Sequence, residues 1–289
     1  SCTQSTSMFC AANHSKKPLL AAERRPLALK LQRRIEGPLA RDARIVADRA
    51  ARGWAAAARS ASLSAFLHEP GARVGAYRQA FLELSLRAEA LRFGEFHLKS
   101  GRTSPYFFNA GQFNTGAALA GLADCYAEAL LESGVGFDML FGPAYKGIPL
   151  ATALAVALAK RGRDVPVAFN RKEAKTHGEG GTLIGAPLTG RVLIVDDVIT
   201  AGTAVLESVE IMRAAGGTPC GVLIALDRQE RGAEGQRSAA AEASAALGVP
   251  VVAVARLDDL FMFVADRPEL ALHRERLLAY RSQYGSTDG

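Results

Sequence analysis

The chain has 289 residues, 49% of them hydrophobic, and a formal net charge of +6, a size sufficient for one large α/β domain with an appendage. No run of about eighteen apolar residues is free of charge, which excludes an ordinary membrane-spanning helix, and the four cysteines form no C-x-x-C pair, which argues against a zinc site or a disulfide framework. We therefore expect a cytoplasmic protein that does not contact a membrane.

The first 75 residues differ from the remainder. They carry thirteen Lys or Arg and five Asp or Glu, a balance of +8, and are rich in Ala and Arg. A transit peptide, a nucleic-acid-binding arm and translated sequence upstream of the true start are three interpretations, of which we favour the last. Because interleaved aromatic residues are nearly absent, we expect no nucleic-acid partner. We assign residues 1–75 to a basic extension of uncertain structure, either disordered or a start-site artefact, and residues 76–289 to the functional domain.

Readable periodicity begins at residue 76. Apolar residues spaced by three and four predict one face of a helix: Tyr77, Phe81, Leu84, Ala88 and Leu91. Two strands, FGEFHL and SPYFFNAG, flank the basic turn KSGRT, where Gly101 permits a tight reversal. We expect this part to form a small hood.

Helices and apolar strands alternate further along the chain. Helices are predicted at residues 115–133 and 148–161, and strands at DMLFG, VPVAFN, VLIV, GVLIAL and VPVVAVA. Continuous apolar runs that alternate with helices predict an α/β fold with a parallel sheet flanked by helices. Ligands of such sheets bind beyond the carboxyl ends of the strands.

Two polar segments follow predicted strands. In FGPAYKGIPLA, a turn with Tyr145 and Lys146 offers backbone donors and one cation to a diphosphate, although an ordinary turn with a solvated lysine is the alternative. NRKEAKTHGEGGTLIG combines cations with glycines, which is typical of a lid that closes over phosphates. A solvated surface run is the alternative there.

The segment RVLIVDDVITAGTA places two carboxylates after a buried strand. Because such a strand cannot hold unpaired charges, Asp196 and Asp197 must lie at its open end. The small turn after them leads into a helix near Ala204, and its N–H groups and threonine hydroxyls would cradle a phosphate. Neither G-x-x-x-x-G-K-[ST] nor G-x-G-x-x-G is present, which argues against an ATPase or a dehydrogenase.

In LDRQERG, Arg228 follows the strand GVLIAL. Its guanidinium can bind a carboxylate in bidentate fashion, or it can form a surface ion pair with Asp227 or Glu230.

VLIVDDVITAGTA resembles the phosphoribosyl pyrophosphate (PRPP) signature of the type I phosphoribosyltransferases, and LKSGRTSPYFFNAG is similar to the orotate phosphoribosyltransferases among them. The likeness covers about residues 76–289. It implies the type I phosphoribosyltransferase fold and transfer of the phosphoribosyl group from PRPP to orotate, giving orotidine 5′-monophosphate and pyrophosphate in pyrimidine (UMP) biosynthesis. It also implies Mg²⁺ held mainly through PRPP, with no certain protein ligand, and a homodimer with shared active sites.

The resemblance also implies roles for particular residues. Catalytic roles fall on Lys172, Lys175, His177 and Asp197. Orotate would contact the Phe107–Phe108 backbone, Thr200 and Arg228. PRPP would contact Lys99 across the dimer interface and residues of three loops: Tyr145, Lys146, Arg171, Lys172, Lys175, His177, Asp196, Asp197, Val198, Ile199, Thr200, Ala201, Gly202, Thr203 and Ala204. Whether His177 donates a proton or only a hydrogen bond stays open.

Two alternatives use the same PRPP signature. A purine phosphoribosyltransferase would lack LKSGRTSPYFFNAG and an arginine that reads a carboxylate. A PRPP-sensing regulator that binds nucleic acid would use the basic first 75 residues and would not need the lid cations. No decarboxylase-sized second domain follows the predicted last helix, so we expect a monofunctional enzyme.

Overall fold

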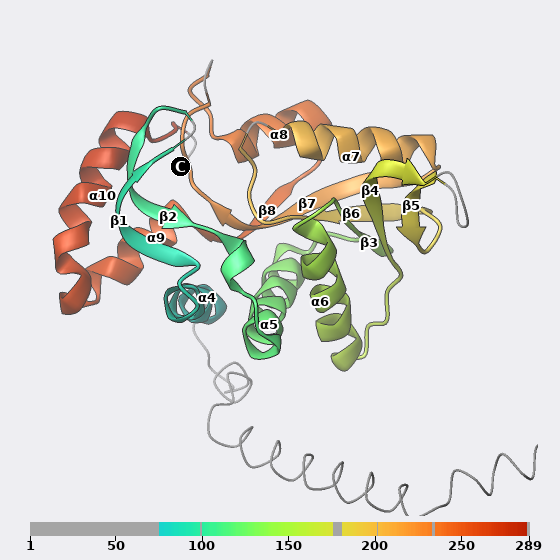
Figure 1. The fold of residues 1–289 in the computed structure, drawn as a ribbon, viewed down its shortest axis with the longest axis horizontal. Helices are drawn as coiled ribbons and strands as arrows, with labels where there is room; N and C mark the ends of the chain where they lie inside the picture. Colours follow the sequence, from blue (N-terminus) through green and yellow to red (C-terminus); the bar gives the residue numbers. More distant parts are fainter. Residues whose placement is uncertain (1–74, 99, 176–180, 201, 233–234, 288–289) are drawn as a thin grey trace, which may run out of the picture. The chain divides into compact units, whose positions relative to one another are not determined.

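The computed structural model describes residues 75–98, 100–175, 181–200, 202–232 and 235–287 (Figure 1). The predictions made for residues 1–74, Lys99, His177 and Ala201 lie outside these ranges. For Lys175 the backbone is described and the side chain is not.

In the described part of the chain, the main sheet has six strands in the order β5-β4-β3-β6-β7-β8. Five strands run parallel, and β5 is an antiparallel edge strand beside β4. The strands are β3 Met139–Gly142, β4 Val167–Lys175, β5 Gly181–Gly185, β6 Arg191–Val195, β7 Thr218–Asp227 and β8 Val251–Arg256. These pairings confirm the prediction of a parallel sheet. Strands β6 and β7 are apolar runs buried on both faces, as is typical of parallel strands covered by helices.

Helices cover both faces of this sheet (Figure 1). On one face lie α5 (Gly116–Ser133) and α6 (Gly147–Lys160), and on the other α7 (Thr203–Ala214) and α8 (Ala239–Leu247). Buried side chains of α5 and α6 belong to one hydrophobic cluster and those of α7 to a second, against which Leu247 of α8 packs. Across the described ranges, no helix is both long and apolar enough to cross a membrane.

A separate hairpin forms the predicted hood. It pairs β1 (Leu91–His97) with β2 (Thr103–Phe108), and a short 3₁₀ turn, Ala110–Gln112, follows. Three helices complete this part of the fold: the first and the last contact the hairpin, and the middle one packs against both of them (Figure 1). They are α4 Ala76–Arg87, α9 Leu257–Ala265 and, after the 3₁₀ turn Pro268–Leu270, α10 Ala271–Tyr284.

The first predicted helix was too long. Helix α4 ends at Arg87, and Glu89 has a φ of 55°. A residue in this left-handed region cannot continue a right-handed helix. The chain therefore turns, and Leu91 begins β1 instead of extending the apolar helix face.

The predicted polar lid also needs correction. Its two flanks are strands, because β4 continues to Lys175 and β5 begins at Gly181. Arg171 and Lys172 thus lie in a strand and not in a loop. An antiparallel edge pair can be polar because its outer part does not have to bury a core face. Residues 176–180, between the two strands, lie outside the described ranges.

Gly147 allows α6 to begin close to the ends of β3 and β6. A Cβ atom at this position would lie 2.5 Å from Cδ of Pro143 and 2.6 Å from the carbonyl oxygen of Val195. Real Cβ atoms do not approach other heavy atoms this closely. The absence of a side chain at Gly147 therefore sets how near the N-terminus of α6 comes to β6.

We expect Gly147→Ala to lower the free energy of unfolding by about 1–3 kcal/mol, because the added methyl group forces backbone shifts in a packed region. Chemical denaturation measures this change. Gly116→Ala is the control, since a Cβ at Gly116 has no neighbour within 4 Å. We expect the control to leave stability unchanged or slightly higher. Equal losses in both variants would contradict the steric explanation.

Candidate functional site

Three loops meet at one edge of the sheet. They follow β3, β6 and β7, which are neighbours in the sheet and run parallel, so their carboxyl ends lie together. The loops contain the predicted turn 143–146, residues 196–200 with Gly202, and the segment that begins at Arg228.

Backbone pairing continues beyond β6 and places the two aspartates. The N–H of Asp196 donates to the carbonyl of Leu223 at 3.0 Å, and the N–H of Ala225 donates to the carbonyl of Asp197 at 2.9 Å. The hydroxyl of Tyr126 on α5 donates to the carbonyl of Asp196 at 2.9 Å. Tyr126 was not predicted as a site residue, because the sequence shows it only as one position within a predicted helix.

Asp197 forms an ion pair with Lys146 from the neighbouring loop. Nζ of Lys146 lies 2.5 Å from Oδ2 of Asp197. Asp197 is buried, whereas the Lys146 side chain is 52% exposed. From the sequence, Lys146 was expected to contact a diphosphate, and no local pattern indicated that it would pair with Asp197.

The loop after β3 has a second anchor. The N–H of Ala144 donates to Oδ1 of Asn170 in β4 at 2.8 Å, and the peptide bond between Ala144 and Tyr145 is cis. Tyr145 is exposed, and Nζ of Lys172 lies 5.4 Å from the centre of its ring. The structure thus brings Tyr145 and Lys172, both predicted site residues, to the same place, next to half-buried Arg171.

Asp196 is a partly buried carboxyl group. Burial, together with the adjacent negative charge of Asp197, raises its pKa to about 7. Its Oδ1 accepts a hydrogen bond from the N–H of Asp197 at 2.9 Å. Near neutral pH this group is therefore balanced between its protonated and ionised forms.

The N-termini of α6 and α7 both lie at this edge, and neither has a side-chain cap. By contrast, Thr115 caps α5 and Ser238 caps α8. Gly202, with a φ of 72°, provides the left-handed turn that starts α7. The first N–H groups of α6 and α7 can therefore bind an anion.

The remaining predicted PRPP residues lie around this turn. Thr200, Thr203 and Ala204 are exposed. Val198 and Ile199 are half-buried, and they pack against the two hydrophobic clusters.

Arg228 binds Glu230 and reaches the hood. Its Nη2 lies 2.6 Å from Oε1 of Glu230, and its Nε donates to the hydroxyl of Tyr106 at 3.3 Å. The side chains of Arg228 and Glu230 are 23% and 13% exposed. The alternative prediction of an ion pair with Glu230 is therefore confirmed. This pair is largely buried and does not lie on the surface, as that alternative had expected.

The residue after Arg228 holds the loop in place. Gln229 is buried and has a left-handed φ of 48°. Its Nε2 donates to Oδ2 of Asp258 at 2.9 Å, and its Oε1 accepts from the N–H of Asp258 at 2.9 Å. Sequence reasoning missed this role, since nothing local links residue 229 to the start of α9.

The aromatic rings of β2 pack within the hood. The Phe107 ring stacks on Phe96 at 5.5 Å, and the Phe108 ring lies 6.0 Å from that of Phe81. The alternative of a packed strand therefore holds for both rings. The predicted orotate contact concerns the backbone of Phe107 and Phe108, and it stays a prediction.

Comparisons with known proteins agree with this geometry. A family model described as a phosphoribosyl transferase domain matches residues 110–239, which include all three loops. The chain is 67% identical over 212 residues to orotate phosphoribosyltransferase of Xanthomonas campestris pv. campestris (strain B100), a match that covers 73% of this chain and 97% of the relative. It is 64% identical over 209 residues to that of Laribacter hongkongensis (strain HLHK9), covering 72% and 98%.

A solved structure gives the same result. The crystal structure of orotate phosphoribosyltransferase from Francisella tularensis matches with a TM-score of 0.65 and 45% sequence identity. The match covers 71% of this chain and 99% of that chain.

The pKa of Asp196 predicts how stability depends on pH. An unfolded aspartate ionises near pH 4, whereas folded Asp196 keeps its proton to about pH 7, so its contribution to stability is lost as the pH rises between these values. Asparagine does not ionise, so Asp196→Asn abolishes this loss of stability with rising pH. We therefore expect the melting temperature of the variant, relative to wild type, to rise from pH 4 to pH 8 in thermal denaturation.

Asp138→Asn is the control for this measurement. The Asp138 carboxylate accepts hydrogen bonds from Arg191, which lower its pKa to about 2, so removing its charge should lower the melting temperature at neutral pH. A melting temperature of Asp196→Asn that falls relative to wild type between pH 4 and pH 8 would contradict the raised pKa.

Proposed function

The chain belongs to the orotate phosphoribosyltransferases, and we propose from this membership which of its residues bind the two substrates and stabilise the transition state. Enzymes of this family have the type I phosphoribosyltransferase fold and transfer a phosphoribosyl group from PRPP to orotate. The 67% identity over 97% of a relative's length carries the assignment, and it favours orotate over a purine base or a regulatory role.

We propose that PRPP spans the three loops. The uncapped N-terminus of α7, with Thr200 and Thr203, would bind the 5-phosphate. The N-terminus of α6 and Lys146 would bind the diphosphate. In the structure, Lys146 forms an ion pair with Asp197.

Binding of PRPP would therefore break the ion pair between Lys146 and Asp197 and form two new interactions. The diphosphate takes Lys146, and the released Asp197 accepts hydrogen bonds from the ribose hydroxyls beside Asp196. The half-exposed position of Lys146 supports this exchange, because its side chain can turn towards solvent without breaking a core contact. Lys172, together with Lys99, Lys175 and His177, would supply further positive charge to the diphosphate.

Orotate would lie between the PRPP site and the hood. We assign its carboxylate to Arg228 and its ring edge to Thr200 and the backbone of Phe107 and Phe108. The hydrogen bond from Arg228 to Tyr106 in β2 supports this assignment, since it links the arginine to the same strand as Phe107.

The reaction needs charge stabilisation and no nucleophilic side chain. The ring nitrogen of orotate attacks the anomeric carbon as the bond to pyrophosphate breaks. Positive charge develops on the ribose, where Asp197 would stabilise it, and negative charge on the leaving diphosphate, where Lys172, Lys175 and His177 would. Fixed groups that match these charges lower the barrier because they need little rearrangement during the reaction.

The carboxylates also suit Mg²⁺ bound mainly through PRPP. Asp196 and Asp197 are hard oxygen donors, and no described group of three His, Cys, Asp or Glu residues forms a complete metal cage. These two aspartates would hold the ion by way of the ribose hydroxyls. When bound, it supplies positive charge to the diphosphate.

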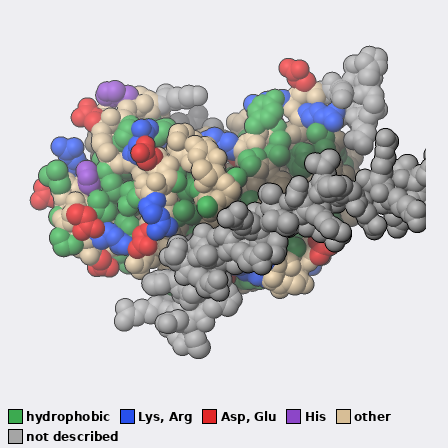
Figure 2. All heavy atoms as spheres, turned by 60° about the horizontal axis from the view of Figure 1, so that its bottom comes forward, with side chains coloured by type: hydrophobic (Ala, Val, Ile, Leu, Met, Phe, Trp, Pro, Cys, Tyr) green, Lys and Arg blue, Asp and Glu red, His purple; other side chains and the backbone are tan. Residues whose placement is uncertain are grey.

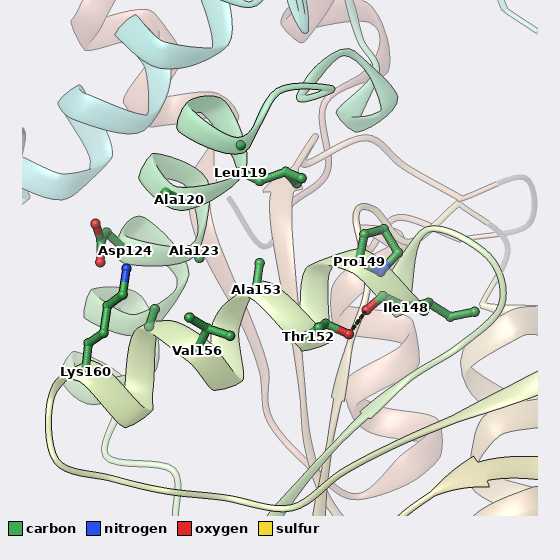
Figure 3. Close-up of a pocket in the computed structure, with 12 residues that line it drawn as sticks. Leu119, Ala120, Ala123, Asp124, Ile148, Pro149, Thr152, Ala153, Val156 and Lys160 are labelled. Carbon is green, nitrogen blue, oxygen red and sulfur yellow. Dashed lines mark hydrogen bonds between the residues drawn. The ribbon is translucent and has the colours of Figure 1, made fainter. Parts of the chain in front are cut away.

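We propose a homodimer that joins through α5 and α6. A groove of about 410 Å³ lies between these helices, and mostly small and apolar side chains line it (Figure 3). Leu119 and Ala120 of α5 face Ala153 and Val156 of α6 across it, and the Val156 side chain is largely exposed for an apolar residue. An apolar face beside the loop with Lys146 would bring a second subunit close to the active site, as a shared site requires.

We also propose that residues 76–289 carry the whole activity and that residues 1–75 are a separate extension. The cytoplasm is the proposed location of the enzyme. The alignments support the proposed limits of the active domain, since they cover nearly the full length of the relatives and about 73% of this chain.

The assignment of Arg228 leads to a direct test. Wild type should consume orotate only with PRPP and Mg²⁺ present, and release one pyrophosphate per orotate. Arg228→Lys keeps the charge and loses the bidentate geometry. We expect it to raise the KM for orotate at least about tenfold, a cost of about 1.4 kcal/mol, and to leave the KM for PRPP within about twofold. An unchanged KM for orotate would exclude Arg228 as the carboxylate-binding residue.

The proposed dimer face is tested by adding a charge to it. Val156→Glu should shift wild-type dimers towards monomers in analytical ultracentrifugation, because a carboxylate in an apolar interface is costly. Leu272→Glu is the control. Leu272 is 74% exposed on α10. Acidic and basic side chains are interspersed on the face of the folded domain that Figure 2 shows at the left, the side on which α10 lies in Figure 1. A dimer that survives Val156→Glu would exclude the α5 and α6 face.

A further inference from the structure

Arg228, Tyr106 and Glu230 form a closed ring of contacts. Nε of Arg228 donates to the Tyr106 hydroxyl at 3.3 Å, and that hydroxyl lies 3.5 Å from Oε1 of Glu230. The same Oε1 pairs with Nη2 of Arg228 at 2.6 Å. The guanidinium carbon also lies 5.2 Å from the centre of the Tyr106 ring. One edge of the guanidinium is thus held by the protein itself.

The other edge of the guanidinium points to a role for this ring of contacts. The hydrogen bond and the ion pair of the guanidinium both involve its Nε and Nη2 atoms, and Nη2, although it lies at ion-pair distance from Glu230, is a buried nitrogen without a hydrogen-bond partner among the described residues. Arginine has five N–H donors in a planar fork, so the Nη1 side keeps donors for a ligand carboxylate while the Nε side is occupied.

Glu230 is itself fixed from a second direction. Its Oε2 lies 3.6 Å from Nη1 of Arg102, in the turn between β1 and β2. Nη2 of Arg102 donates to the carbonyl of Arg231 at 3.0 Å, and its guanidinium lies 5.0 Å from the Tyr284 ring. The hood, the loop after β7 and the end of α10 therefore all restrain the one carboxylate that holds Arg228.

The charges of this cluster also fit a single anionic group. Two guanidinium groups, Arg102 and Arg228, share one carboxylate, Glu230, and the Tyr106 hydroxyl is fully buried and neutral, since burial raises its pKa. One positive charge is left over. A ligand with one carboxylate would balance it.

We propose that Tyr106 and Glu230 are positioning residues that hold the guanidinium of Arg228 ready for the carboxylate of orotate. The inference rests on the role of Arg228 given in the proposed function. A free arginine side chain loses considerable rotamer entropy when it is fixed by a ligand. An arginine that the protein has already fixed loses less on binding, and the ligand binds more tightly.

Tyr106→Phe tests the hydroxyl with no change in formal charge or in the ring. We expect the KM for orotate to rise about tenfold or more, as the loss of a hydrogen bond to a charged group predicts, while kcat and the KM for PRPP stay within about twofold. Tyr284→Phe is the matched control. It removes a hydroxyl from the same aromatic cluster, and this hydroxyl has no hydrogen bond to a described residue, so both KM values should be unchanged.

Glu230→Asp provides a second variant if Tyr106→Phe folds poorly. It keeps the charge and shortens the side chain by one methylene group, so the carboxylate can no longer reach Nη2 of Arg228 at 2.6 Å from the same backbone position. We expect the same selective rise in the KM for orotate. A thermal melt shows whether each variant is folded at the assay temperature.

Combining each variant with Arg228→Lys separates positioning from general structural damage. If Tyr106 and Glu230 act through the guanidinium, their effect on the KM for orotate should disappear in the Arg228→Lys background. An equal effect in both backgrounds would overturn the proposal. So would an unchanged or lowered KM in Tyr106→Phe, which would mean that the ring of contacts does not aid binding.

A different set of results is expected if Arg228 does not bind the carboxylate of orotate. If Arg228→Lys alone leaves the KM for orotate unchanged, Arg228 does not bind the carboxylate, and both the assignment and the positioning role fall. If Arg228→Lys raises that KM and the other two variants do not, only the positioning role falls.

Discussion

The parallel pairing of β3, β6 and β7 is the constraint on which the site depends. The pairing aligns Phe141 with Ile194 and Val195 with Leu223, so three loops begin at the same edge of the sheet. The ladder continues to Asp196 and Asp197 through backbone hydrogen bonds. Backbone hydrogen bonds therefore determine where Asp196 and Asp197 lie.

Charges placed at a buried edge of the sheet need partners within the protein. Asp197 has Lys146 and Arg228 has Glu230, while Asp196 holds its proton more strongly than an exposed aspartate. Such pairs contribute little net stability, because removing two charges from water costs about as much as their attraction returns. Their value lies in holding charged groups close to where the charges of PRPP and orotate would be.

The sequence predicted most elements of the fold and failed where a backbone conformation or a neighbouring strand decided the outcome. Helix α5 begins and ends as expected because Thr115 caps it and Gly134 ends it. Helix α4 stops early because Glu89 adopts a left-handed conformation that its residue type does not reveal. The flanks of the predicted lid are strands because β4 and β5 pair with each other, which a polar run of residues does not indicate.

By itself, the sequence determined the α/β class, the order of most strands and helices, and the segments that follow the strand ends. These features depend on apolar periodicity and on residues that are neighbours in the chain. Only the tertiary structure decided which side chains bind each other. Lys146 and Asp197 are 51 residues apart, and Tyr106 and Arg228 are 122 apart. Contacts over such separations depend on sheet order and on how the hood packs, and no local pattern of residues encodes them.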